Sequence, residues 1–174
     1  IVLGISWFSV QAQKYYAAVL YGQGVRSLTA GSLGEAEGYL VRAVRFDRRD
    51  LYFRSLTELG LARLGEIVNR QGARPEELRA QFQNILAETI GNAQQANSLN
   101  PVDALNWMSL GRVYEAILPF RIQGAADFAK NSYSEALKRF PSNPEPYLAQ
   151  ARVEILEGRT KEAKDFLLKA VELK

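Results

Sequence analysis

The stretch "NWMSLGRVYEAI", residues 106–117, places a glycine in the middle of a segment whose apolar residues have helical spacing. Glycine inside a helix costs about 1 kcal/mol relative to alanine, so local propensity does not select Gly111. A close approach of a neighbouring helix at this point would compensate for that cost. The segment therefore predicts a helix that crosses a second helix at Gly111.

One spacing of small and large side chains recurs along the chain. Ala129, Tyr133 and Ala136 are followed by Pro141, which suits a helix that ends in a turn. The same order of small, large and small residues is found at Ala36, Leu40 and Ala43, and at Ala163, Leu167 and Ala170. Thr89, Ala93 and Ala96, with Pro101 five residues further on, form a degenerate copy of it. Small residues let a neighbouring backbone approach, and the large residue fills the space between them. Four helices of one type are therefore expected.

The rest of the chain is also rich in helix-forming residues, and no long stretch alternates apolar and polar residues as a strand would. Glycine and proline mark the breaks. Helices are expected over residues 8–30, 33–46, 51–70, 75–98, 103–119, 125–139, 144–157 and 160–173. The sequence therefore predicts an all-α fold.

These motifs resemble the tetratricopeptide repeat (TPR), whose first helix carries W-x2-L-G-x2-Y and whose second carries A-x3-F before a proline. The full match is to Trp107, Leu110, Gly111, Tyr114, Ala129, Tyr133, Ala136 and Pro141. Weaker first-helix copies are Leu20, Gln23 and Gly24, and Tyr147, Gln150 and Ala151, whereas the register of residues 51–64 is ambiguous. The resemblance implies a right-handed α-α superhelix of about four helix hairpins over residues 17–174, with repeats at about 17–50, 51–103, 104–143 and 144–174.

The repeats are unequal in length. The standard unit has about 34 residues, and the second and third units are longer. We expect elongated helices or an added turn around residues 65–90, and an insertion near "LPFRIQG", residues 118–124. Insertions in solenoids often face a binding surface.

Composition excludes several kinds of function. The chain has no cysteine and no histidine, which excludes disulfides, cysteine nucleophiles, zinc fingers and Ser-His-Asp triads. Its net charge of +3 gives no indication of nucleic-acid binding. Adjacent carboxylates such as Glu76 and Glu77 lie near predicted helix ends and are interpreted as solvated caps. We therefore predict no enzyme, no catalytic residue, no metal site and no cofactor, and we expect Tyr15, Tyr16 and the tryptophans to be core or helix-crossing residues.

The TPR resemblance implies a protein or peptide partner bound in a groove lined by the first helices. The expected lining residues are Tyr21, Val25, Leu105, Met108, Arg112, Leu148 and Arg152. Arg112 and Arg152 occupy equivalent positions in their repeats. They are expected either to hold a peptide carboxylate or to pair with Glu115 and Glu145. The lysines and asparagines of the family's chaperone-tail clamp are not present, so no clamp of that kind is predicted.

A second candidate surface is the basic cluster Arg42, Arg45, Arg48 and Arg49. One interpretation is a set of cations at a helix C-terminus, partly neutralised by Asp47 and Asp50. The alternative is a contact for anionic lipid head groups or for the phosphate of a polysaccharide.

The N-terminal lead-in, residues 1–16, begins with the apolar run Ile1–Val10, which is too short to span a membrane. It is either part of the first helix or the outer end of a span, which would place membrane attachment N-terminal to Ile1. With the uneven repeats, it resembles the C-terminal repeat domain of bacterial O-antigen polymerase or ligase-like membrane proteins. That resemblance implies a membrane-associated, extracytoplasmic domain of polysaccharide assembly.

Two further alternatives are a free-standing cytoplasmic TPR scaffold and a carbohydrate- or lipid-head-group-binding domain. The last predicted helix would leave Phe166, Leu167 and Val171 without a covering helix. Either the natural chain continues or this end packs on another copy, which would make a homo-oligomer. The function predicted from the sequence is a non-catalytic protein–protein interaction module.

Overall fold

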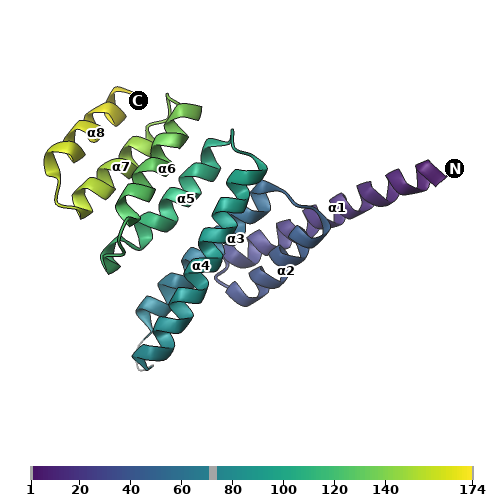
Figure 1. Ribbon diagram of the computed structural model, residues 1–174. Coiled ribbons are helices and arrows are strands. Elements are labelled where there is room, and N and C mark those ends of the chain that lie inside the picture. The colour runs from purple at the N-terminus through teal and green to yellow at the C-terminus, as the bar shows by residue number, and fades with distance from the viewer. Residues whose placement is uncertain (1, 71–73, 174) are drawn as a thin grey trace. The chain divides into compact units, whose positions relative to one another are not determined.

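The computed structural model describes residues 2–70 and 74–173, and within these ranges all regular secondary structure is helical (Figure 1). The helices are α1 (Val2–Thr29), α2 (Leu33–Phe46), α3 (Asp50–Asn69), α4 (Pro75–Leu99), α5 (Ala104–Ala116), the 3-10 helix η1 (Leu118–Phe120), α6 (Ala125–Arg139), α7 (Glu145–Leu156) and α8 (Thr160–Glu172). The predicted all-α fold is confirmed. Two bounds were wrong: α1 begins at Val2 rather than at residue 8, and the segment 103–119 divides into α5 and η1.

The chain forms two compact units, residues 1–96 and 97–174. The first unit is built from the hairpins α1/α2 and α3/α4, and the second from α5/α6 and α7/α8. Leu40, Phe53 and Leu56 belong to the core of the first unit, and Met108, Tyr133 and Val153 to that of the second.

Side chains near the turns explain where α5 and α7 begin. The carboxylate of Asp103 accepts a hydrogen bond from the backbone N–H of Leu105 at 2.8 Å. The side-chain oxygen of Asn143 accepts one from the N–H of Glu145 at 3.0 Å. Such caps satisfy amides that the first turn of a helix leaves without a partner.

The prediction that another helix passes close to Gly111 is confirmed. A Cβ atom added there would lie closer than 3.0 Å to the ring of Tyr133 on α6, which is fully buried. Gly24 stands in the same relation to Leu40 on α2, at 2.7 Å from its Cγ. The glycines are therefore selected by close helix packing, which offsets their poor helix propensity.

The structure resolves the ambiguous register of α3. Gly60 is its crossing glycine, because a Cβ added there would lie closer than 3.0 Å to the side chain of Thr89 on α4. The spacing to Pro101 had predicted that Ala93 takes the position of Leu40 and Tyr133. The contact instead lies one helical turn earlier, at Thr89. This hairpin is longer than the others, so the number of residues between the crossing and the proline is larger here.

The unequal repeats are visible in the helices. α3 and α4 have 20 and 25 residues, which confirms the elongated second hairpin. The predicted insertion forms η1 and a turn before α6, in which Arg121 and Gly124 adopt left-handed backbone conformations with φ of 53° and 80°. It lies on the second unit, where η1 packs beside both α5 and α7.

α1 has 28 residues and is twice as long as its partner α2, which has 14, so its N-terminal part extends past the end of α2 (Figure 1). Tyr15 is 75% exposed and Tyr16 is 40% exposed, so the prediction that they are core residues is wrong. The reason is that α2 ends at Phe46, whose ring makes an edge contact with Tyr16 at 5.0 Å. Among the described residues, no helix is both long and apolar enough to cross a membrane.

Candidate partner-binding surfaces

The first helices of the second unit present one exposed surface, which we call the α5/α7 face. Its residues are Leu105 and Arg112 on α5, and Leu148, Arg152 and Ile155 on α7. The spacing of three, four and seven residues places the members from each helix on one side of that helix. Leu105 is 53% exposed and Ile155 is 55% exposed. The face therefore combines open aliphatic side chains with two arginines.

Met108 was expected to line this surface, but its side chain is buried. It packs in the core with Tyr133 and Val153, on the side of α5 that faces α6 and α7. A buried side chain is not available to a partner, so Met108 does not belong to the α5/α7 face.

Arg152 is held by carboxylates of its own unit. Its guanidinium donates two hydrogen bonds to Glu115, at 2.7 and 3.3 Å, and lies 3.6 Å from the carboxylate of Glu145. The hydrogen bonds to Glu115 raise the pKa of Arg152 above its usual range. Of the two interpretations offered by the sequence, pairing with Glu115 and Glu145 is the one that the structure contains for Arg152.

The same carboxylate ties the surface to the core. Glu115 also accepts a hydrogen bond from the hydroxyl of Tyr133, the residue that packs on Gly111. Burial, and then the negative charge of Glu115, raise the pKa of Tyr133 far above its usual range, while Arg152 and Arg112 oppose this shift. The structure therefore brings both predicted arginines into one charged cluster above the buried tyrosine.

The two groove residues predicted in the first unit are both half-buried, and Tyr21 packs against its core. The ring of Tyr21 stacks on that of Tyr52 at 4.8 Å, and its hydroxyl accepts a hydrogen bond from Ser55 at 3.4 Å. Val25 is half-buried. Their membership of a partner-binding groove stays a prediction.

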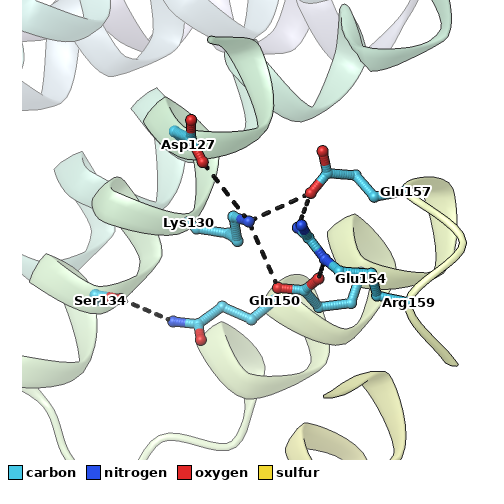
Figure 2. A network of polar contacts seen from close by, with 7 residues as sticks. All are labelled: Asp127, Lys130, Ser134, Gln150, Glu154, Glu157 and Arg159. Carbon is cyan, nitrogen blue, oxygen red and sulfur yellow. Dashed lines mark hydrogen bonds and ion pairs between the residues drawn. The ribbon is translucent and has the colours of Figure 1, made fainter. Parts of the chain in front are cut away.

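A network of charged side chains joins α6 to the end of α7 and its turn into α8 (Figure 2). Lys130 lies at the centre, 3.7 Å from Asp127, 3.7 Å from Glu154 and 3.2 Å from Glu157. Arg159 donates hydrogen bonds to both Glu154 and Glu157. Glu154 is buried, so its charge requires these two cations as partners.

Next to this network lies a recess of about 360 Å³ at the insertion between α5 and α6. It is lined by Leu118, Arg121, Ile122, Gln123, Gly124, Ala126, Asp127, Leu156 and Glu157. The sequence indicated the insertion but not the recess. The lining residues come from three separate elements, and none of them has a motif that marks it as part of a site.

The basic cluster is arranged around aromatic rings. Arg42 donates a hydrogen bond to the hydroxyl of Tyr16 at 2.7 Å. Arg48 lies over the ring of Phe53 at 5.6 Å, and Arg49 over that of Tyr52 at 5.9 Å. All four arginines of the cluster are exposed. Such cation–π contacts orient a guanidinium without neutralising its charge.

Among the described residues, no group of three or more acidic side chains is arranged to hold a metal ion. On α8, Leu167 and Val171 are exposed, and Phe166 is half-buried. The predicted homo-oligomer through this end of the chain stays a prediction.

Neither a known family model nor a curated protein matches the chain. Solved structures do match. MamA is 21% identical with a TM-score of 0.63, over 95% of this chain and 82% of that one. TTC0263, a thermophilic TPR protein of Thermus thermophilus, is 25% identical with a TM-score of 0.72, over 90% and 73%. MamA AMB-1 is 21% identical with a TM-score of 0.60, over 90% and 78%. These similarities give no support to the narrower resemblance to O-antigen assembly proteins.

Proposed function

We propose that this chain, which has the TPR fold, is a non-catalytic protein-interaction scaffold whose second unit binds a partner through the α5/α7 face. TPR-like solved structures support the general statement that such a chain binds proteins or peptides. The finer statement, that the α5/α7 face is the binding surface, is our inference.

The observation that carries the proposal is the exposure of Leu105 on α5 and of Ile155 on α7, where Ile155 lies one helical turn from the fixed Arg152. Aliphatic side chains that are more than half exposed lose contact with water when a partner covers them, at about 25 cal/mol per Å². Arg152 is already oriented by Glu115, so little side-chain entropy is lost when it contacts a partner. Arginine beside apolar residues is typical of the centre of a protein interface.

Charge indicates what kind of partner suits this surface. The two arginines, Arg112 and Arg152, are equal in number to the two glutamates, Glu115 and Glu145. These four side chains therefore do not favour a strongly acidic or a strongly basic partner. A peptide carboxylate would compete with Glu115 for Arg152. We therefore expect an apolar side of a helical or extended peptide to provide most of the affinity, with the arginines providing orientation.

Charge substitution on the face tests the proposal. Leu105→Glu and Ile155→Glu should each remove specific partners from an affinity purification quantified by mass spectrometry against the unmodified chain. The matched control is Val68→Glu on α3, because Val68 and Leu105 are both 53% exposed. Loss of the same partners in the control variant, or their full retention in both face variants, would contradict the proposal.

The same structural similarities bear on whether the chain is a free-standing scaffold or part of a membrane protein. The solved neighbours include a protein described as a TPR protein, which favours a free-standing scaffold over a part of a polysaccharide-assembly membrane protein. The gene sequence upstream of Ile1 distinguishes the two. Several apolar spans there would favour the membrane protein, and a further stretch of charged and polar sequence would favour the scaffold.

A second candidate function is contact with an anionic lipid or glycan surface. It is favoured by the exposed aromatic rings of Tyr15, Tyr16 and Phe46 beside the exposed Arg42 and Arg45. α1 has no acidic residue along its length. Aromatic rings and arginines together suit the interface of an anionic membrane.

Vesicle binding tests this second function. The chain should sediment with phosphatidylglycerol vesicles and not with phosphatidylcholine vesicles, and the double variant Arg42→Gln/Arg45→Gln should weaken sedimentation. A double variant at Arg54 and Arg79, outside the cluster, is the control. Equal sedimentation of both double variants would exclude the cluster, and binding to a phosphorylated glycan array alone would assign it to a polysaccharide.

A further inference from the structure

We propose that the exposed side of α8 binds a second copy of the same helix, so that two chains form a symmetric dimer through α8. The residues of this side, which we call the α8 face, are Lys164, Leu168, Val171 and Glu172. They share no member with the α5/α7 face, so the inference goes beyond the proposed function and does not depend on it. It rests on two places, one in each unit, where the chain packs a helix on the equivalent side of an earlier helix.

The turns and the buried residues show which positions of α2, α6 and α8 are equivalent. Each helix begins one or two residues after a glycine whose φ lies in the left-handed region, at Gly31, Gly124 and Gly158. Five residues after that glycine, each helix has a buried alanine, at Ala36, Ala129 and Ala163. The next position is therefore equivalent in the three helices, and it is occupied by Glu37, Lys130 and Lys164.

In both units this position forms an ion pair with the helix that packs next. Glu37 accepts hydrogen bonds from Arg63 on α3, at 2.7 and 2.5 Å. Lys130 lies 3.7 Å from Glu154 on α7 (Figure 2). The sign of the charge differs between the two units, but each packing helix has the opposite charge at this point. Lys164 is exposed and forms no ion pair with any residue that the structure describes, so we expect a carboxylate opposite it.

The contact between α6 and α7 gives the spacing that such a partner needs. On α6, Ser134 lies four residues after Lys130. It accepts a hydrogen bond at 3.2 Å from Gln150, which lies four residues before Glu154 on α7 (Figure 2). The two helices therefore run antiparallel, and successive contacts are four residues apart on each. A helix packed on α8 in this way needs a residue opposite Leu168 and a carboxylate four residues later.

The sequence of α8 itself meets this requirement. Glu172 lies four residues after Leu168, as Lys164 lies four residues before it. When two copies of α8 pack antiparallel about Leu168, this residue meets its counterpart, and Lys164 of each chain meets Glu172 of the other. An isologous contact of this kind uses the same patch on both chains and closes as a dimer.

The aliphatic side chains of the α8 face favour a contact with another helix. Leu168 is 52% exposed and Val171 is 68% exposed. Their equivalents on α2, Val41 and Val44, pack against the core cluster that contains Phe53 of α3. In the chain's own packing these positions are therefore covered by a helix. A second copy of α8 would remove two such side chains of each chain from water.

Exchange of the charges tests the dimer. Sedimentation equilibrium of the full chain should show monomers and dimers whose proportions depend on concentration. Lys164→Glu and Glu172→Lys, each alone, should raise the dissociation constant of the dimer about tenfold, because each places like charges opposite one another. An equimolar mixture of these two variants should recover the affinity of the unmodified chain, since every contact between the two variants joins opposite charges.

Two further variants make the result specific to the α8 face. Leu168→Ser should weaken the dimer and should leave the circular dichroism of the monomer unchanged, since the side chain is exposed. Lys169→Glu is the matched control on the same helix. The ammonium of Lys169 lies over the ring of Phe166, at 5.8 Å, and one residue of spacing turns it away from Leu168. This variant should leave the dissociation constant unchanged.

The proposal is overturned if the unmodified chain stays monomeric at millimolar concentration. It is also overturned if the mixture of Lys164→Glu with Glu172→Lys associates no better than either variant alone. A dimer that is lost in Leu105→Glu but kept in Leu168→Ser would contradict it as well, by assigning the contact between copies to the α5/α7 face.

Discussion

The helices of the α3/α4 and α5/α6 hairpins cross in the same way, but the hydroxyl group at each crossing has a different hydrogen-bond partner. Both place a glycine against a buried side chain, which is Thr89 for Gly60 and Tyr133 for Gly111. The hydroxyl of Thr89 donates back to the carbonyl of Ile85 within its own helix, at 2.6 Å. The hydroxyl of Tyr133 instead reaches Glu115 on the neighbouring helix and, through it, Arg152 on the next hairpin.

This difference shows two uses of one packing device. In the elongated hairpin the crossing is a local, self-contained contact between two helices. In the third hairpin it is also a link between the core and the α5/α7 face. A substitution at the α3/α4 crossing should therefore change stability alone. A substitution at the α5/α6 crossing should change both stability and the hydrogen bonds between Glu115 and Arg152.

The largest expected difference between the crossings comes from truncating the buried side chain. Tyr133→Ala should destabilise the second unit by about 3–5 kcal/mol, because it leaves a large cavity at a fully buried position. Thr89→Ala should cost the first unit only about 1 kcal/mol, since far fewer atoms are removed. Urea unfolding followed by far-ultraviolet circular dichroism measures both costs, and Trp107 fluorescence, in a Trp7→Phe background, follows the second unit alone. A similar cost at both sites would contradict the comparison.

Filling the crossing should have the next largest effect. Gly111→Ala should cost about 3 kcal/mol, because the buried ring of Tyr133 has no room to move, and Gly60→Ala about 2 kcal/mol. Gly65→Ala in the same helix as Gly60 is the control, since an added Cβ there meets nothing within 4 Å. It should stabilise the protein by up to about 1 kcal/mol in thermal unfolding. A stabilising Gly111→Ala would show that the crossing is looser than described.

Alkaline pH should separate the two hairpins, because Tyr133 titrates and Thr89 does not. Burial and Glu115 raise the pKa of Tyr133 in the folded state, so above about pH 10 the unfolded chain loses its proton first. The free energy of unfolding that Tyr133 contributes is fully present below about pH 10. It should decline above that pH by up to about 1.4 kcal/mol per pH unit. Urea unfolding between about pH 9 and 11 measures this decline. An equal slope in Tyr133→Phe would assign it to other groups.

Removing only the hydroxyls should have a smaller effect. Tyr133→Phe should cost about 1–2 kcal/mol, because Glu115 loses a donor in a partly buried place. Thr89→Val should cost less than about 1 kcal/mol, since the carbonyl of Ile85 keeps its helical partner. Chemical denaturation at neutral pH compares the two. If Thr89→Val were the more harmful change, the account of the α3/α4 crossing as self-contained would be wrong.

The smallest expected effect concerns one arginine–glutamate pair in each unit, Arg63 with Glu37 and Arg152 with Glu115. Arg63 donates two hydrogen bonds to Glu37, at 2.7 and 2.5 Å, and lowers the pKa of that carboxyl, as Arg152 binds Glu115 in the second unit. Both arginines are partly exposed, so Arg63→Lys and Arg152→Lys should each cost less than about 1 kcal/mol. Only Arg152→Lys should also alter the near-ultraviolet spectrum, through Tyr133.

Much of the fold was predictable from the sequence, because glycine, proline and the spacing of alanines are local signals. Gly111, Ala129 and Ala136 all lie at buried positions, as the repeat motif implied. The contact of Gly60 with Thr89 was missed, because it depends on how far two long helices run past their turn. That distance is a tertiary property, and the motif does not encode it.

The candidate surfaces were less predictable. The pair of Arg152 with Glu115 was one of two alternatives that the sequence left open, and only the structure shows which carboxylates Arg152 contacts. Met108 was misplaced by an argument from helical spacing, since a helix can rotate by a fraction of a turn and bury one member of a face. The role of Lys130 was not visible, because two of its three partners, Glu154 and Glu157, lie at the end of α7 and reach α6 only on folding.

Because Tyr133 is hydrogen-bonded to Glu115, its ultraviolet absorbance reports on the environment of that carboxylate. A phenol bonded to a carboxylate absorbs at longer wavelength than one bonded to water or to nothing. Any partner that draws Arg152 away from Glu115 will change the strength of that bond. Docking could then be followed by difference absorbance of an unlabelled sample, before the identity of the partner is known.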